Sequence, residues 1–278
     1  MNREPTLSQA LAALAPYFPN LVIIGGTAHR LFPLHPLGVQ PSFELLTTED
    51  VDIAVSLELA SADDSQLLDA LTNAGFKERI GGADKAECTY VLRSRPTAYL
   101  QFLAPLRGSG EKRDGKPDVH MRVAGIQAKK LRAVDLLLHE PWLAKLDAPD
   151  GAATVPVANP CTYLVQKLVK LHERHGPKLH KDVLYVFDTL TIFGDELAAL
   201  GAVAGLLVPG LTVKQRRRVR DSVEKYFSGT SDACRSAAVL AASQRGNPPS
   251  AAQIAEACRT GLAEALPNLC KPPIRRRS

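Results

Sequence analysis

Long apolar runs, paired cysteines and aromatic side chains are all scarce in this sequence of 278 residues. No apolar run approaches the roughly 20 residues that a membrane-spanning helix needs, so we expect no membrane partner. The N-terminus has no long apolar stretch ending in a small-residue cleavage site, so a secretory signal is not expected. The five cysteines are scattered and form no CxxC, which argues against a zinc ribbon and favours the reducing cytoplasm.

Acidic residues are scarce only in the last part of the chain. From Val213 onward there are 13 Lys/Arg and 5 Asp/Glu, a net charge of +8, whereas the preceding residues sum to −3. Such basic clusters can hold phosphate backbones without sequence specificity, which makes RNA, and tRNA in particular, the first binding partner to consider. A solvated helix face followed by a basic tail explains the same clusters, so both interpretations stay open.

The pattern of apolar residues changes near residue 159. Short apolar strands and helices precede this point, and helical spacing runs through the residues that follow it. We therefore predict an α/β domain with a mixed sheet over residues 1–158 and an all-helical domain over residues 159–278. Within the first domain we expect a polar loop at 107–118, a helix at 127–141 and a hairpin at 142–158.

One short segment has the features of a phosphate-binding turn. In LVIIGGTAHRLF, residues 21–32, an apolar strand runs into Gly25 and Gly26, and a helix follows. Glycines let a phosphate approach the backbone, and the N–H groups at a helix start attract an anion. Thr27 could add a hydroxyl, and His29 could either touch phosphate or pack within the helix.

A second segment carries two carboxylates. In TTEDVDIAV, residues 47–55, Asp50 and Asp52 are two positions apart on an apolar strand, so they project from the same face. Two ionised carboxylates this close repel each other unless a cation lies between them, and Mg²⁺ prefers such oxygen ligands. Either segment alone is commonly a tight turn or a solvated strand end. Together they predict a site for a metal-bound nucleoside triphosphate.

These two segments, IIGGTAHRL and TTEDVDIAV, resemble the signature of the nucleotidyltransferase fold, also called the polymerase-β-like superfamily. The resemblance is to bacterial proteins related to AbiEii-type toxins. It implies transfer of a nucleotidyl group from an NTP with Mg²⁺ or Mn²⁺ as cofactor. Asp50 and Asp52 would be the catalytic, metal-binding residues, and Gly25, Gly26 and Thr27 would bind the triphosphate. An antitoxin-like partner is implied by the resemblance only.

The resemblance continues in NPCTYLVQKLVKLHERHGPKLHKDVLYVFDTL, residues 159–190. The positions that match the family pattern are Asn159, Pro160, Tyr163, Lys167, Leu168, Arg174, Lys181, Asp182 and Asp188. The resemblance places Lys167 at the triphosphate as a point charge. Alternatively, the stem of Lys167 packs at the edge of the core with its ammonium in water. Lys170 has the same two interpretations.

The strand predicted at 97–106, TAYLQFLAPL, departs from the family pattern. Relatives are expected to carry a third acidic residue at the position of Gln101, and this strand contains neither Asp nor Glu. A neutral amide cannot act as a base. Glu87 on the neighbouring strand could replace it only by pointing to the same face. Two functions therefore stay open: an Mg²⁺-dependent transferase moving NMP from an NTP to an acceptor, or a catalytically degenerate nucleotide- or nucleic-acid-binding module.

Overall fold

The computed structural model describes residues 5–59, 66–81, 88–148 and 151–270, so Glu87 lies outside the described residues. The chain divides into two compact units. The sheet unit comprises Met1–Leu31 and Thr47–Asn159, and the helical unit comprises Phe32–Leu46 and Pro160–Ser278. A short segment between the two candidate motifs therefore belongs to the helical unit, although most of that unit follows residue 159.

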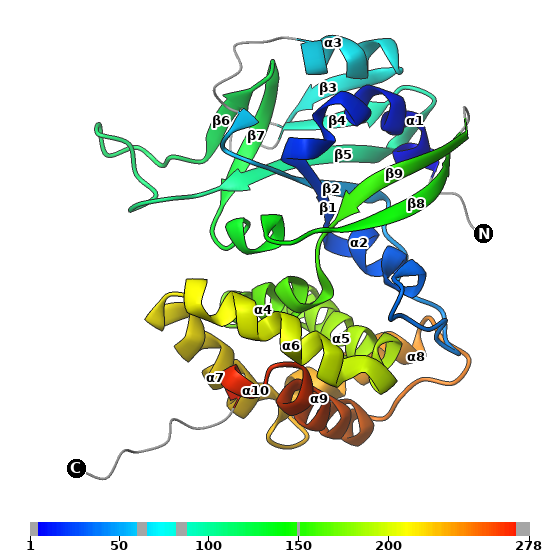
Figure 1. Cartoon of the computed structure of the whole chain (residues 1–278), viewed down its shortest axis with the longest axis vertical. Coiled ribbons are helices and arrows are strands. Elements are labelled where there is room, and N and C mark those ends of the chain that lie inside the picture. The colour runs from blue at the N-terminus through cyan, green and yellow to red at the C-terminus, as the bar shows by residue number, and fades with distance from the viewer. Residues whose placement is uncertain (1–4, 60–65, 82–87, 149–150, 271–278) are drawn as a thin grey trace. The chain divides into compact units, whose positions relative to one another are not determined.

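The sheet unit is built on a mixed sheet that has nine strands among the described residues (Figure 1). Seven of them follow the order β3-β4-β5-β2-β1-β9-β8, and β6 and β7 join through the pairing of β7 with β5. The strands are β1 Leu21–Ile24, β2 Asp50–Val55, β3 Phe76–Ile80, β4 Cys88–Leu92, β5 Arg95–Pro105, β6 His120–Val123, β7 Ile126–Leu131, β8 Trp142–Ala148 and β9 Gly151–Val157. The strand with the two aspartates thus lies at the centre of the sheet, between β1 and β5.

Among the described residues of this unit, three α-helices accompany the strands: α1 Pro5–Leu14, α2 Gly25–Leu31 and α3 Gln66–Asn73. Leu7, Leu11 and Leu14 of α1 are almost fully buried, as the i, i+4, i+7 spacing requires of one helix face. α1 packs against α3, and α2 packs against β1 and β2. The contacts of α2 hold the glycine turn beside the strand with the two aspartates.

Cross-strand register sorts the side chains of the sheet onto two faces. Tyr90 is paired with Leu100, and the Tyr90 ring meets the Phe102 ring edge-on at 5.4 Å. These three side chains are buried, and each contributes about 1.5–3 kcal/mol of hydrophobic stabilisation. The alternate positions Asp50, Asp52, Tyr99 and Gln101 are only partly buried and point to the opposite face. One face therefore forms the core, and the other face presents the polar side chains.

The prediction of a helix over residues 127–141 is wrong. The chain forms β7 there, followed by a short 3-10 helix at Asp135–Leu138. Ile126 and Ala128 are fully buried while Gln127 is half-buried, which is the period of two expected for a strand. Backbone pairing with both β5 and β6 stabilises this strand, and such long-range pairing overrides local helical spacing.

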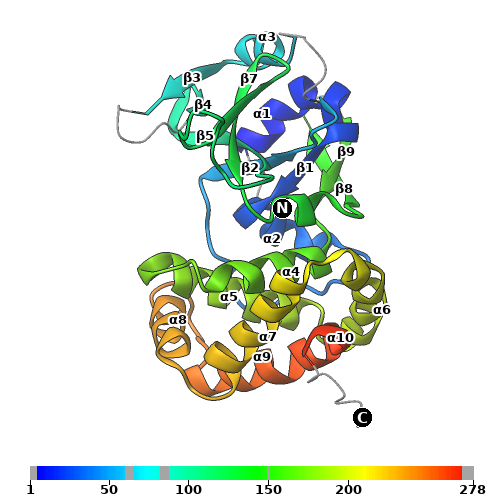
Figure 2. The same ribbon diagram turned by 90° about the vertical axis from the view of Figure 1, so that its left-hand side faces the viewer.

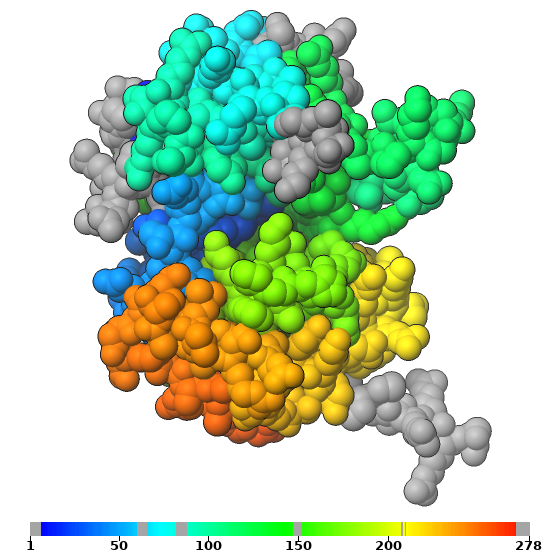
Figure 3. Space-filling model, turned by 180° about the vertical axis from the view of Figure 1, so that it is seen from behind, coloured from blue at the N-terminus to red at the C-terminus, as the bar shows by residue number. Residues whose placement is uncertain are grey.

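The predicted loop between β5 and β6 is a small hairpin-like arm. The N–H of Lys112 donates to the carbonyl of Lys116 over 2.8 Å, and Glu111 is bridged to Pro117. The arm projects from the sheet unit, on the left in Figure 1 and on the right in Figure 3. The hairpin predicted at 142–158 is also present, because β8 and β9 pair in antiparallel register.

The helical unit contains α4 Pro160–Leu171, α5 Gly176–Ile192, α6 Leu197–Leu207, α7 Val213–Phe227, α8 Asp232–Ala242, α9 Ala251–Ala265 and α10 Pro267–Cys270 (Figure 2). α5 is its central element, since it packs against α4, α8 and α9. Capping boxes begin α7 and α9, where Thr212 and Ser250 each accept a backbone hydrogen bond three residues on.

The segment Phe32–Leu46 is fixed to the helical unit by aromatic and backbone contacts. Phe32 meets the rings of Tyr163 and Phe193 at 5.2 and 5.8 Å. The N–H of Val39 donates to the carbonyl of Ile192 over 2.9 Å. Thus the chain after α2 is fixed by side chains that lie more than a hundred residues later.

Within the described ranges, no single helix combines the length and apolar character needed to cross a membrane. α5 and the following segment Gly194–Leu206, bent by 75° at their junction, meet that test together by length and composition only.

Candidate active site

The Gly25 turn lies directly against Asp52. Gly25 has a φ of +65°, a left-handed conformation that glycine adopts without strain. A Cβ atom added at Gly25 would lie 2.3 Å from Oδ2 of Asp52. The antiparallel pairing of Ile24 with Asp52 sets this approach. Glycine is therefore required here both by the backbone conformation and by the neighbouring carboxylate.

Asp50 is held at the start of β2 by hydroxyl groups. Thr27 donates to the backbone carbonyl of Asp50 over 3.1 Å, and Thr48 donates to Oδ1 of Asp50. Thr27 is fully buried, so its hydroxyl ties α2 to β2. Its contact with a triphosphate stays a prediction. Gly26 follows Gly25 in the first turn of α2.

The third position of the site is occupied by Gln101. In the parallel pair of β2 and β5, Gln101 is the direct partner of Asp52, and Tyr99 is the partner of Asp50. The side chain of Gln101 is half-buried on the same face as the two aspartates. The amide thus stands beside the carboxylates and adds a neutral oxygen where the family resemblance implies an acid.

Asp50 and Asp52 fit a divalent cation that is shared with a substrate. Across the described part of the chain, no group of three or more His, Cys, Asp or Glu side chains could hold a metal ion. The two carboxylates share one face, and the Asp52 carboxylate packs directly against the Gly25 backbone where a Cβ would otherwise lie. One or two carboxylates completed by substrate phosphates are a usual ligand set for Mg²⁺.

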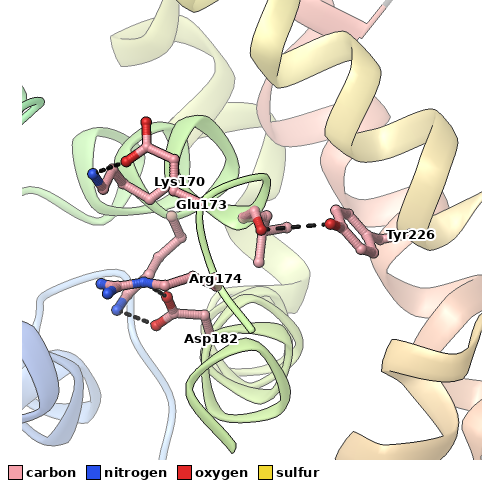
Figure 4. Close-up of polar contacts among 7 residues, drawn as sticks. Lys170, Glu173, Arg174, Asp182 and Tyr226 are labelled. Carbon is pink, nitrogen blue, oxygen red and sulfur yellow. Dashed lines mark hydrogen bonds and ion pairs between the residues drawn. The ribbon is translucent and has the colours of Figure 1, made fainter. Parts of the chain in front are cut away.

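Lys167 belongs to the helical unit, where its ammonium is enclosed by polar and aromatic groups. Nζ lies 2.6 Å from Oδ1 of Asp182 and 5.1 and 4.7 Å from the ring centres of Tyr163 and Tyr185. Arg174 donates to the other oxygen of Asp182 over 2.9 Å (Figure 4). Asp182 therefore bridges two cations. The alternative of an ammonium in open water does not apply, because Lys167 is only 7% exposed.

A second carboxylate near the end of α4 also bridges two cations. Glu173 is paired with Lys170, as Figure 4 shows, and with Arg218 of α7 at 2.6 Å. Partial burial raises the pKa of the Glu173 carboxyl, but the two cations outweigh burial and leave the pKa lowered. Glu173 thus links the end of α4 to α7 through Arg218, and Lys170 is its second cationic partner.

Asp188, another position of the downstream pattern, is buried in an ion pair. Its two carboxylate oxygens accept hydrogen bonds from Arg245 at 3.0 and 2.6 Å, and neither side chain is more than 1% exposed. Burial raises the pKa of Asp188 to about 6, against the opposing effect of Arg245. Arg245 also donates to the carbonyl of Glu44 and stacks on Phe43, so this pair holds the segment before β2.

Comparison with known proteins identifies the class to which this fold and site belong. The sequence matches the family described as Nucleotidyltransferase over residues 5–202, which is more than half of the chain. The chain therefore belongs to this nucleotidyltransferase family. The predicted fold class, a mixed-sheet nucleotidyltransferase fold followed by helices, is confirmed.

Two solved structures resemble the chain at low identity. One is MenT4, a nucleotidyltransferase toxin from Mycobacterium tuberculosis H37Rv, at 14% identity and a TM-score of 0.40, covering 94% of this chain and 82% of that one. The other is an antigenic nucleotidyltransferase-like protein from Paracoccidioides brasiliensis, at 16% identity and a TM-score of 0.37, covering 76% and 93%. No curated protein sequence matches the chain.

Proposed function

We propose that this protein is an Mg²⁺-dependent nucleotidyltransferase that moves NMP from an NTP to an acceptor hydroxyl. The observation that carries the proposal is the contact of the Gly25 turn with Asp52, with Asp50 on the same face. In such a transfer the acceptor oxygen forms a bond to the α-phosphorus, the bond from that phosphorus to the bridging oxygen breaks, and pyrophosphate leaves. The proton of the acceptor passes to solvent or to a base.

Each residue of the candidate site would have a separate role in this transfer. Asp50 and Asp52 would hold Mg²⁺, which supplies neutralisation of the charge on the phosphate oxygens. Gly25 and Gly26 would let the triphosphate approach the backbone without a side chain in the way. Gln101 cannot take the acceptor proton, so the chain must rely on solvent or on the acceptor's own acidity at this position.

Labelled nucleotides test this proposal directly. The full chain is incubated with each α-labelled NTP, Mg²⁺ or Mn²⁺, and total RNA or protein as acceptor. We expect label transfer by the wild type and its loss, by about 10²-fold or more, in Asp52→Asn. Asp195→Asn, an exposed carboxylate of the helical unit, serves as the matched control and is expected to retain transfer. Equal transfer by wild type and Asp52→Asn would refute the proposal.

A second function is favoured by the position of Gln101 beside Asp52. If the neutral residue has removed the chemistry, the protein is a nucleotide- or nucleic-acid-binding module. Nucleotide binding without transfer, measured by calorimetry and by the labelling assay on the same sample, would support this second function over the first.

Three finer proposals rest on the resemblance and on composition. RNA, with tRNA first, is proposed as acceptor because of the basic C-terminal part of the sequence. A toxin-like role opposed by an antitoxin-like partner is proposed from the resemblance alone, and growth arrest by the wild type but not by Asp52→Asn would support it. A cytoplasmic location is proposed because all five cysteines are free thiols, which a reducing compartment maintains, and a bacterial source is proposed from the resemblance alone.

A further inference from the structure

One row of side chains crosses four strands of the sheet and ends at Asp50. Lys77 of β3 is the register partner of Val91, Val91 is the partner of Tyr99, and Tyr99 is the partner of Asp50. Register partners project to the same face of a sheet. The row therefore lies on the face that carries both aspartates. Three inter-strand spacings of about 4.8 Å make it about 14 Å long.

The row combines an aromatic ring with unpaired positive charge. Tyr99 is half-buried, and the guanidinium of Arg79 lies 5.7 Å from the centre of its ring. Arg79, Lys77 and Arg93 are exposed. Among the residues that the structure describes, no carboxylate forms an ion pair with any of these three cations. The row thus combines a guanidinium lying over an aromatic ring, on which a base can stack, with further cations for anionic groups.

A groove lies along the Lys77 end of the row, away from Asp50. It has a volume of about 800 Å³, and its lining includes Lys77, Arg79, Val91, Arg93 and Pro96. Glu78 also lines the groove, but its carboxylate accepts hydrogen bonds from Tyr90 over 3.2 Å and from Cys88 over 3.3 Å. Because Tyr90 is a core-face residue, the carboxylate is engaged on the side away from the cations. The groove is therefore basic and has an apolar floor.

We infer that this row and groove, called here the β3–β5 groove, bind a single-stranded nucleic acid acceptor and lead its end toward Asp50. The inference deepens the proposed nucleotidyl transfer and rests on it for the role of the bound strand. Unpaired bases stack on aromatic side chains, and exposed Lys and Arg hold the phosphates on either side.

The positions of the turn and the groove separate the two substrates. The Gly25 turn approaches Asp52 from β1, on one side of β2. The groove lies on the other side, beyond β5 and β4. A nucleoside triphosphate at the turn would leave the β5 side open. The cations of the groove continue two strands beyond Tyr99, farther than the phosphates of one bound nucleotide at Asp50 require. This extension favours a polymer as the occupant.

Binding of labelled oligonucleotides to the full chain tests the inference. Fluorescence anisotropy is measured without NTP or metal for single-stranded RNA, single-stranded DNA of the same sequence, and the duplex, between about 50 and 200 mM salt. Lys77→Glu/Arg93→Glu is expected to weaken single-strand binding by about 10-fold or more. The steepness with which the logarithm of the binding constant falls with the logarithm of the salt concentration is expected to decrease by about 1.4, because two phosphate contacts are lost. Tyr99→Leu is expected to weaken it about 5- to 100-fold, and Tyr99→Phe to restore it.

The matched control reverses two exposed charges outside both the groove and the basic C-terminal part, Lys145→Glu/Lys178→Glu, on β8 and α5. We expect this control to bind single strands within about threefold of the wild type, and circular dichroism checks that every variant is folded. The inference is overturned if the wild type binds only duplex, if the groove variants bind like the wild type, or if the control variant shows the larger loss. Because no transfer is measured, an inactive enzyme that binds single strands contradicts only the proposed function. Transfer to another acceptor without strand binding contradicts only this inference.

Discussion

Gln101 is the direct cross-strand partner of Asp52 in the parallel pair of β2 and β5. The neutral side chain thus stands beside Asp52 in the neighbouring strand, on the same half-buried face. The remainder of the site keeps the glycine turn and both aspartates. We therefore expect the identity of residue 101 to decide whether the site only binds a nucleotide or also transfers it.

Gln101→Glu is expected to raise nucleotidyl transfer, because a carboxylate there can bind metal or accept the acceptor proton. We expect a gain of about 10-fold or more in the labelling assay, which corresponds to about 1.4 kcal/mol of barrier. Gln101→Leu provides the control that removes the amide without adding charge. No gain with Glu, at unchanged NTP affinity, would show that this position takes no part in transfer.

Gly25→Ala is expected to destabilise the sheet unit and to impair the site together. The left-handed φ costs about 1–2 kcal/mol for alanine, and the new methyl group would lie within 2.3 Å of Asp52 unless the carboxylate moves. Urea unfolding and the labelling assay measure the two effects. Gly229→Ala is the matched control, since a Cβ there has nothing within 4 Å. Wild-type activity in Gly25→Ala would contradict the proposed role of the turn.

Lys167→Met is expected to lower the free energy of unfolding by about 2–3 kcal/mol. Leaving a buried charge unpaired costs about 3–5 kcal/mol, but Arg174 still pairs with Asp182 in this variant, so the loss is smaller. Chemical denaturation measures it, with Lys178→Met as an exposed control. Unchanged stability combined with a raised KM for NTP would instead favour the predicted triphosphate contact of Lys167.

The stability of the helical unit is expected to fall as pH rises from about 4 to about 6. Burial raises the pKa of Asp188 to about 6 in the folded chain, against 3.8 for the unfolded carboxyl. The folded state therefore binds this proton more tightly, and its advantage disappears as pH passes the folded pKa. The change is on the order of 3 kcal/mol. Denaturation at several pH values should show this slope in the wild type and in Asp221→Asn, but not in Asp188→Asn.

Sequence pattern predicted the central strands and the hairpin near residue 150 because their buried residues are strongly apolar. It missed β3, in which Phe76 is the only fully buried residue, and it assigned β7 to a helix. Both strands carry many polar side chains, and their pairing partners supply most of what specifies them. Edge and long-range strands of this kind have little local signal.

The site was predictable where its residues are close in sequence. The spacing of Asp50 and Asp52 places them on one face regardless of the rest of the chain. The row from Lys77 to Asp50 was not predictable, because it depends on the register of four strands that are not all consecutive. The ion pair of Lys167 with Asp182 could not be predicted from the sequence either, because it depends on how α4 packs against α5.

The segment Phe32–Leu46 has a consequence for how the protein can be made. The carbonyl of Glu44 is held by Arg245, a residue synthesised 201 positions later. During translation this segment must therefore wait, without its final contacts, until most of the helical unit has emerged. We expect that a chain truncated before residue 245 leaves Phe32–Leu46 without this contact. A single cut at residue 159 would also not separate the two units, because Phe32–Leu46 belongs to the helical unit but precedes the cut.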